Sequence, residues 1–429
     1  MTNGYEAVLN NLDSPPNSAQ LPSERIKWLS LGQALATALV VFLLFNLSLG
    51  LLLYSFLQVL SSNADQESAF SMMLLASGLF TVGLLLIPSV LLAFSRFFGW
   101  KRPTWFSSLR LPWLAILLLA YPPILLAGNW LSKQSVLAFL LLPFFHIAAI
   151  GLPIAAILQI GLRGLDSVSH QRKWGALSVG LTLSPFLIFI LELFAFILPI
   201  VLLAVWVSQD PERLSQFSRL SEILRQPLAD PQMMLNELQP YLSEAAVVFT
   251  LLFFAALIVP LIEEAIKPLG VWLLYGRTRG ALDGFVSGAL CGAGYALLES
   301  FLLGSSKSDW LFAVLGRSGT GTIHIFTSAL IGAALTTAWQ RQSYLRLSLA
   351  YLIGVFFHGV WNGFIILAAL RGISDSSQGF WSLPLTQNLA TIAPFAILLL
   401  AALAVLGLWG LNQQIRKEWS TIGSISVEG

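Results

Sequence analysis

Charged residues are scarce in this sequence. Asp, Glu, Lys and Arg together make up 10% of the 429 residues, whereas hydrophobic residues make up 56%. Soluble domains carry roughly 25% charged residues, so a water-soluble fold is excluded and a lipid bilayer is the expected environment. The net charge of +2, with no stretch that interleaves basic and aromatic residues, also excludes a nucleic-acid-binding surface.

Cysteine is almost absent, and a signal peptide is not evident. Cys291 alone cannot form an intrachain disulfide or a CxxC metal site, and its apolar surroundings in the sequence predict a packing role. Residues 1–29 are polar and lack the short apolar core of a signal peptide. We expect them to form a polar cytoplasmic tail.

Long apolar runs fill most of the remaining chain. A helix that spans a membrane needs about 20 mostly apolar residues. Runs of this kind lie near 33–60, 71–95, 112–132, 136–161, 175–206, 245–275, 281–303, 319–340, 347–370 and 389–411. The sequence therefore predicts an all-α fold, a polytopic transmembrane helix bundle of about ten spanning helices.

Lys and Arg are enriched in alternate connections between these runs. Cytoplasmic loops accumulate such residues, and an inside amino terminus places the basic connections on that side. We therefore expect a multi-pass protein of the cell (plasma) membrane with both termini cytoplasmic. The basic residues on the predicted inner side are Arg25, Lys27, Arg96, Lys101, Arg102, Arg110, Arg163, Arg172, Lys173, Arg277, Arg279, Arg341, Arg346, Arg416 and Lys417.

The longest polar connection divides the chain. It mixes charged residues with Leu, Met and Phe at helical spacing and is punctuated by proline, which predicts short amphipathic helices on the outer surface. The membrane segments before it contain few ionisable groups, and those after it contain many. The predicted parts are the tail 1–29, an amino-terminal five-helix membrane region 30–206, the extracytoplasmic amphipathic loop 207–244, a membrane core 245–411 and a cytoplasmic tail 412–429.

Ionisable side chains gather at one depth in the membrane core. Each such side chain costs a few kcal/mol in hydrocarbon, so each is a candidate functional residue. Counting from the nearest cytoplasmic charge at about 1.5 Å per residue places them roughly 18 to 27 Å from the inner ends of their helices. Antiparallel helices therefore bring them to a common level. The group consists of Glu263, Glu264, Lys267, Glu299, His324, His358 and Asn362.

Spacing within each helix indicates which of these side chains share a face. His358 and Asn362 lie four residues apart and point the same way, as do Tyr295 and Glu299. Glycines at every fourth position of the seventh run, Gly284, Gly288 and Gly292, allow a neighbouring backbone to approach closely. We expect this helix to be central.

The two adjacent glutamates are expected to differ in role. Glu263 and Glu264 lie about 100° apart around the helix, so one can face the cavity while the other meets Lys267. A structural ion pair with Lys267 accounts for only two of these three residues.

Two kinds of hydrolytic chemistry fit the cluster. A carboxylate among apolar walls can take a proton from water, while an imidazole and an amide stabilise the oxyanion formed on a peptide carbonyl. Alternatively, Glu299, His324 and His358 supply the ligands of an open catalytic zinc site, which makes Zn²⁺ a candidate cofactor. No HExxH motif is present, so the usual zinc-protease helix is absent.

Four ordered motifs resemble those of the PrsW family of intramembrane peptidases, within the wider group of CAAX-prenyl endopeptidases. The resemblance covers roughly residues 255–370 and implies a peptidase core that cleaves a membrane protein substrate. The motifs are Glu263-Glu-Ala-Ile-Lys267, the segment from Asp283-Gly-Phe to Tyr295-Ala-Leu-Leu-Glu299, His324-Ile-Phe-Thr-Ser and His358-Gly-Val-Trp-Asn362.

The resemblance also implies roles for these residues. Glu263 would activate water with support from Glu264, and Glu299 and His324 would complete the pocket. His358 and Asn362 would form an oxyanion or ligand pair. The family is described both as a metallopeptidase and as a metal-independent glutamic peptidase, which leaves the cofactor open. Ser300 departs from the family pattern, in which Asn often follows this glutamate.

The same polar residues also fit two other classes of membrane protein. A proton- or cation-coupled transporter would also use carboxylates and histidines at the membrane midplane, and a non-catalytic scaffold would bind a partner through the outer loop. His146 and Glu192 fall at the same depth and are expected to pair with each other. The Pro122-Pro123 pair is expected to break or kink the third helix.

Overall fold

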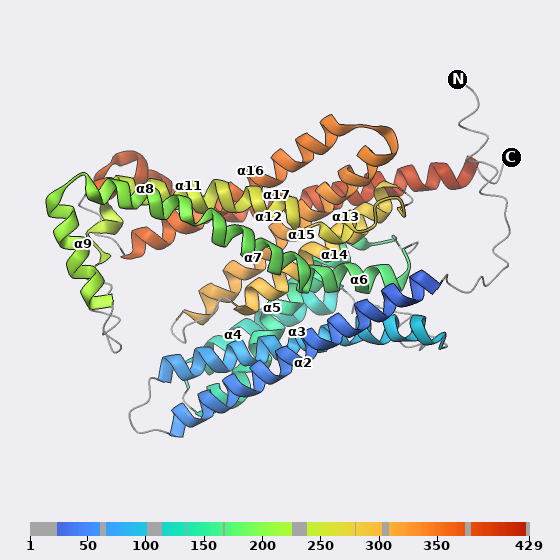
Figure 1. The fold of residues 1–429 in the computed structure, drawn as a ribbon, viewed down its shortest axis with the longest axis horizontal. Helices are drawn as coiled ribbons and strands as arrows, with labels where there is room; N and C mark the ends of the chain where they lie inside the picture. Colours follow the sequence, from blue (N-terminus) through green and yellow to red (C-terminus); the bar gives the residue numbers. More distant parts are fainter. Residues whose placement is uncertain are drawn as a thin grey trace.

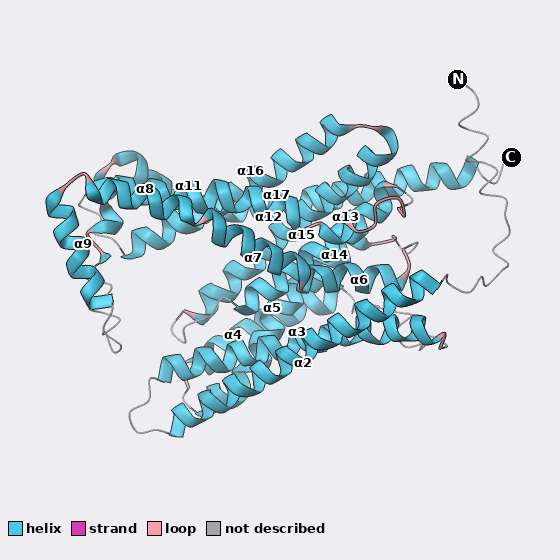
Figure 2. Ribbon diagram, viewed as in Figure 1, coloured by secondary structure: helices cyan, strands magenta, loops and turns pink. Residues whose placement is uncertain are grey.

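All secondary structure in the described residues is helical, as expected for an all-α bundle (Figure 2). The computed structural model describes residues 24–60, 66–100, 114–134, 136–165, 168–224, 238–278, 280–302, 309–373 and 379–425. The helices of the amino-terminal half are α2 (Glu24–Leu60), α3 (Gln66–Phe98), α4 (Leu114–Ser132), α5 (Val136–Leu162), α6 (His170–Leu181), α7 (Leu183–Ala195), α8 (Ile197–Ser208) and α9 (Pro211–Leu224).

The carboxyl-terminal half contains α11 (Ala245–Phe253), a π-helical turn (Phe254–Ile258), α12 (Val259–Ile266), α13 (Leu269–Trp272), α14 (Ala281–Leu302), α15 (Trp310–Arg341), α16 (Tyr344–Ile373) and α17 (Pro384–Ile425). The described residues contain ten helices or helix series that are long and apolar enough to cross a membrane, which confirms the predicted bundle. Many large apolar side chains on its outside, such as Leu119 and Phe312, are exposed, as a lipid-facing surface requires.

The antiparallel pair of α14 and α15 lies at the centre of the molecule (Figure 1). These are the most buried candidate spans in the described part of the chain. A Cβ atom added at Gly284, Gly288 or Gly292 would overlap a backbone carbonyl oxygen of α15. The glycine row therefore sets the close approach that the sequence predicted, because no larger side chain fits between the two backbones.

The fifth predicted span is not one helix but three. α6 ends at Leu181 and α7 ends at Ala195, and each end lies four residues before a proline, Pro185 and Pro199. A proline has no N–H for the carbonyl four residues earlier, and its ring clashes with that carbonyl. The prolines account for both interruptions.

The sixth predicted span is interrupted in the same way. Pro260 follows the π-helical turn and lies four residues after Ala256, and Pro268 separates α12 from α13. The turn places Glu263 and Glu264 one helical turn beyond a local widening of the backbone. Such π-helical turns occur frequently at functional sites.

Pro122 and Pro123 do not break the third predicted helix. Helix α4 runs without interruption from Leu114 to Ser132, so that expectation is wrong. The predicted outer loop does contain a helix, α9, which turns sharply away from α8 and exposes Leu214 and Phe217 (Figure 1). Most of the predicted amino-terminal tail, part of the outer loop and the last residues of the carboxyl-terminal tail lie outside the described residues.

We predict that Gly288→Val lowers the stability of the protein in detergent by about 1–3 kcal/mol, the usual cost of overpacking a tight contact. The added side chain would push against Ser328 of α15. Thermal unfolding followed by tryptophan fluorescence measures the change. Gly32→Val is the matched control, because nothing lies within 4 Å of a Cβ at Gly32. Equal stability of both variants and the wild type would contradict the assigned role of the glycine row.

Candidate functional site

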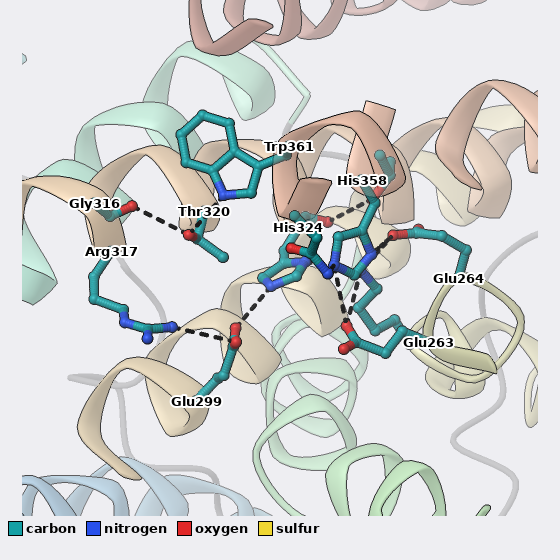
Figure 3. A network of polar contacts seen from close by, with 12 residues as sticks. Glu263, Glu264, Glu299, Gly316, Arg317, Thr320, His324, His358 and Trp361 are labelled. Carbon is teal, nitrogen blue, oxygen red and sulfur yellow. Dashed lines mark hydrogen bonds and ion pairs between the residues drawn. The ribbon is translucent and has the colours of Figure 1, made fainter. Parts of the chain in front are cut away.

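The predicted polar residues come together in one buried cluster between α12, α14, α15 and α16 (Figure 3). Glu264, Lys267 and His324 have no exposed surface, and Glu263 and His358 are almost fully buried. Glu299 is more open, with 25% of its side chain exposed. The common depth inferred from residue counts therefore corresponds to real contacts between helices.

Lys267 lies in the middle of the cluster. Its Nζ donates to Oε1 of Glu264 and lies 3.5 Å from Oε2 of Glu263. The same atom lies 2.8 Å from Nδ1 of His324 and 3.5 Å from Nδ1 of His358. The ammonium thus contacts both glutamates of its own helix and both histidines of the facing helices.

These contacts fix the proton on His324. Lys267 offers only N–H donors, so Nδ1 of His324 must accept a hydrogen bond from it. The other ring nitrogen, Nε2, lies 2.8 Å from Oε2 of Glu299 and donates to that carboxylate. His324 is therefore neutral with its proton on Nε2, and the carboxylate of Glu299 holds the ring in place.

His358 has the opposite arrangement. Its Nδ1 lies 2.9 Å from Oε1 of Glu264, which accepts its proton. Nδ2 of Asn362 lies 3.2 Å from Nε2 of His358 and donates at 2.9 Å to the carbonyl of Ala255 in the π-helical turn. Because an amide nitrogen has no acceptor, Nε2 of His358 must carry a lone pair. Each histidine therefore has a carboxylate behind one nitrogen and a lone pair on the other.

The two adjacent glutamates differ, as the sequence predicted. Oε1 of Glu264 is held by both Lys267 and His358, and the residue is completely buried. Oε2 of Glu263 has no hydrogen-bond partner among the described residues and lies 3.8 Å from Nε2 of His358. Oε2 of Glu264 also lacks a partner in the described part of the chain, but only Glu263 is grouped closely with ring nitrogens of both histidines as a candidate ligand.

The residues fit a metal ion. Glu263, His324 and His358 each offer a ligand atom, and the three atoms lie within 4.8 Å of one another. Catalytic zinc sites use this donor type, and their histidines usually donate the second ring N–H to a carboxylate or carbonyl, as both histidines do here. The ligand set predicted from the sequence contained Glu299 in place of Glu263. In the structure Glu299 lies behind His324.

Tyr295 and Arg317 border the cluster. The ring of Tyr295 packs edge-on against His324 with 5.1 Å between ring centroids, which places this predicted supporting residue at the site. Arg317 pairs with Oε1 of Glu299 at 3.3 Å and was not recognised from the sequence. Its position seven residues before His324, on the same helix face, was the available signal.

Trp361 braces the helices next to the histidines (Figure 3). Its Nε1 donates at 3.1 Å to Oγ1 of Thr320, and its ring packs against Gly319 of α15. This contact fixes α16 against α15 one residue before Asn362.

The expected pair of His146 and Glu192 is not formed. Nδ1 of His146 accepts from Nε1 of Trp310 at 3.2 Å, and Oε1 of Glu192 is buried with no hydrogen-bond partner in the described part of the chain. Helix α7, which carries Glu192, packs against α12 and α14, and this carboxylate interacts electrostatically with Glu299 and Lys267. Equal depth in the membrane was therefore insufficient to identify the partner, because α7 does not pack closely against α5.

Comparison with known proteins finds one family that is similar to this region. A family model described as PrsW family intramembrane metalloprotease matches residues 231–408. Residues 231–408 are thus similar to PrsW intramembrane metalloproteases. No curated protein and no solved structure matches the chain. The matched segment contains every residue of the cluster, and α2 to α9 precede it.

We predict that Asn362→Leu reduces peptidase activity by about 10- to 100-fold, the usual effect of losing a residue that orients a ligand. The leucine removes the donor to His358 and leaves the carbonyl of Ala255 without its partner. Cleavage by the purified variant measures the effect. Asn46→Leu is the matched control, since Asn46 donates only within its own helix. Unchanged activity of Asn362→Leu would show that His358 needs no such orientation.

Proposed function

We propose that this protein hydrolyses a peptide bond of a membrane-embedded or membrane-proximal protein at the site formed by Glu263, His324 and His358. One observation carries the proposal. Among the described residues, Oε2 of Glu263 has no hydrogen-bond partner, and it lies near two imidazoles that each contact a further carboxylate.

Glu263 is the proposed general base. It can take a proton from a water placed between its free oxygen and the histidines, and general-base catalysis of this type contributes about 10²- to 10⁴-fold. Oε2 of Glu264 also lacks a hydrogen-bond partner among the described residues, but Oε1 of this carboxylate holds both Lys267 and His358, and Glu264 is not one of the three residues that could share a metal ion. Its proposed role is to orient His358.

A metal ion at this site would be held by Glu263, His324 and His358, where it would lower the pKa of a bound water and polarise the substrate carbonyl. Glu299 and Glu264 would keep the two imidazoles in the required tautomers. In the site without a metal, Asn362 donates to the carbonyl of Ala255 and to Nε2 of His358, so we assign it to positioning of the ring. A metal ion on Nε2 would take the place of the second hydrogen bond, because that nitrogen has a single lone pair.

The depth of the site restricts the substrate. A transmembrane helix pairs all its backbone groups internally, so its peptide carbonyls are inaccessible until a segment unwinds. We therefore propose that the substrate is a membrane protein with a segment near the site that unwinds readily, such as one that contains glycine or proline.

We predict that Glu263→Ala lowers cleavage of a reconstituted single-span membrane substrate by about 10²- to 10⁴-fold without loss of folding. Mass spectrometry of the products and circular dichroism of the variant measure the two properties. Glu212→Ala, in exposed helix α9, is the control. Normal cleavage by Glu263→Ala would refute the assignment of the base.

We also predict that removal of metal with a chelator abolishes cleavage and that added Zn²⁺ restores it. His324→Ala and His358→Ala should then contain less zinc than the wild type by elemental analysis, because each loses a ligand. Full activity of protein shown to be free of metal would reject the metal and leave Glu263 as a base acting on water alone.

A further inference from the structure

Lys267 stands among the atoms that would ligate a metal ion. It is completely buried at the end of α12, directly before Pro268. Its Nζ lies 2.8 Å from Nδ1 of His324 and 3.5 Å from Oε2 of Glu263. A positively charged group therefore already lies among the donors.

One of these donors cannot serve the ammonium and a metal together. Nδ1 of His324 has a single lone pair, and that lone pair accepts the hydrogen bond from Lys267. A zinc ion would lie about 2.0–2.1 Å from the same nitrogen in the same direction, which leaves no room for the ammonium between them. The two positive charges would also repel each other strongly in a site with little water.

We propose that Lys267 competes with the metal ion for this site. In the metal-free protein its ammonium neutralises Glu263 and Glu264 and holds the lone pair of His324. Metal binding requires Nζ to leave His324. This inference rests on the proposed function in one respect, that the site can bind a metal ion. It assigns to Lys267 the role of setting the affinity of the site for that ion.

The displaced ammonium has other partners within the structure. Glu264 remains its neighbour, and the ring of Tyr295 lies 5.5 Å from Nζ, a cation–π distance. The carboxylate of Glu192 interacts electrostatically with Lys267, and its Oε1 has no hydrogen-bond partner among the residues that the structure describes. The flexible four-carbon stem of lysine permits such a change of partner without movement of the helix.

Zinc affinity of the full-length protein in detergent tests the proposal without any activity measurement. We expect Lys267→Met to bind Zn²⁺ at least tenfold more tightly than the wild type in equilibrium dialysis with elemental analysis. Arg317→Gln is the matched control. It also removes a positive charge beside the cluster, but Arg317 contacts Glu299 and not the ligand atoms. We expect its zinc affinity to stay within threefold of the wild type.

Three results would overturn the proposal: no gain in affinity in Lys267→Met, an equal gain in Arg317→Gln, or no zinc binding by either the wild type or Lys267→Met. If Lys267→Met fails to fold, Lys267→Gln takes its place. A structure of the zinc-loaded wild type gives a second test, since Nζ should then lie beyond hydrogen-bonding distance of Nδ1 of His324. Zinc bound with that contact intact would refute the competition.

The cleavage assay with Glu263→Ala keeps this inference separate from the proposed function. Metal-independent cleavage that requires Glu263 would refute competition with a metal but preserve the peptidase. If Lys267 competes with zinc but the protein cleaves no substrate, the competition is supported and the peptidase function is refuted.

Discussion

Neutralisation of buried charge is the constraint on which the arrangement of the membrane core depends. Breaking a buried ion pair leaves an uncompensated charge at a cost of several kcal/mol. Here the partners come from different helices: Lys267 of α12 contacts His324 of α15 and His358 of α16, and Glu299 of α14 contacts His324. A shift of any one helix along its axis would separate such partners. The site and the register of the four helices therefore stabilise each other.

Proline shapes the backbone that carries this site. Pro260 cannot bond to the carbonyl of Ala256, and the chain widens into a π-helical turn at that point. The widened turn presents the carbonyl of Ala255 to Asn362, which in turn holds His358. A local defect of the helix thus becomes part of the orientation of a histidine on another helix. This link explains why the site residues of α16 lie beside the turn and not beside a regular part of α11.

The fold and the membership of the site could be predicted from the sequence, but its pairings could not. Long apolar runs identify the spans, and a shared depth gathers Glu263, Glu299, His324 and His358, because charge in hydrocarbon must find partners. The rotation of each helix about its own axis decides which carboxylate faces the two histidines. Helices that are apolar on all sides show no hydrophobic periodicity from which this rotation could be predicted. Proline shows the same limit: α4 continues through Pro122 and Pro123, whereas the chain breaks before Pro185 and Pro199. Local chemistry allows both outcomes, and packing decides between them.

The helices of the matched segment pack against helices that precede it in the chain. Gly180 of α6 lies so close to Cys291 of α14 that a Cβ would overlap its carbonyl oxygen, and Gly294 meets the backbone of α6 in the same way. At the predicted cytoplasmic end Arg172 of α6 pairs with Asp283 of α14 at 2.5 Å. Nearer the site, Ser184 of α7 donates at 3.3 Å to the carbonyl of Lys267, which Pro268 follows. Helix α6 packs against α14, and α7 packs against α12 and α14, so both contact helices that carry residues of the buried cluster. The packing that holds these helices therefore includes segments well before residue 231, where the family match begins.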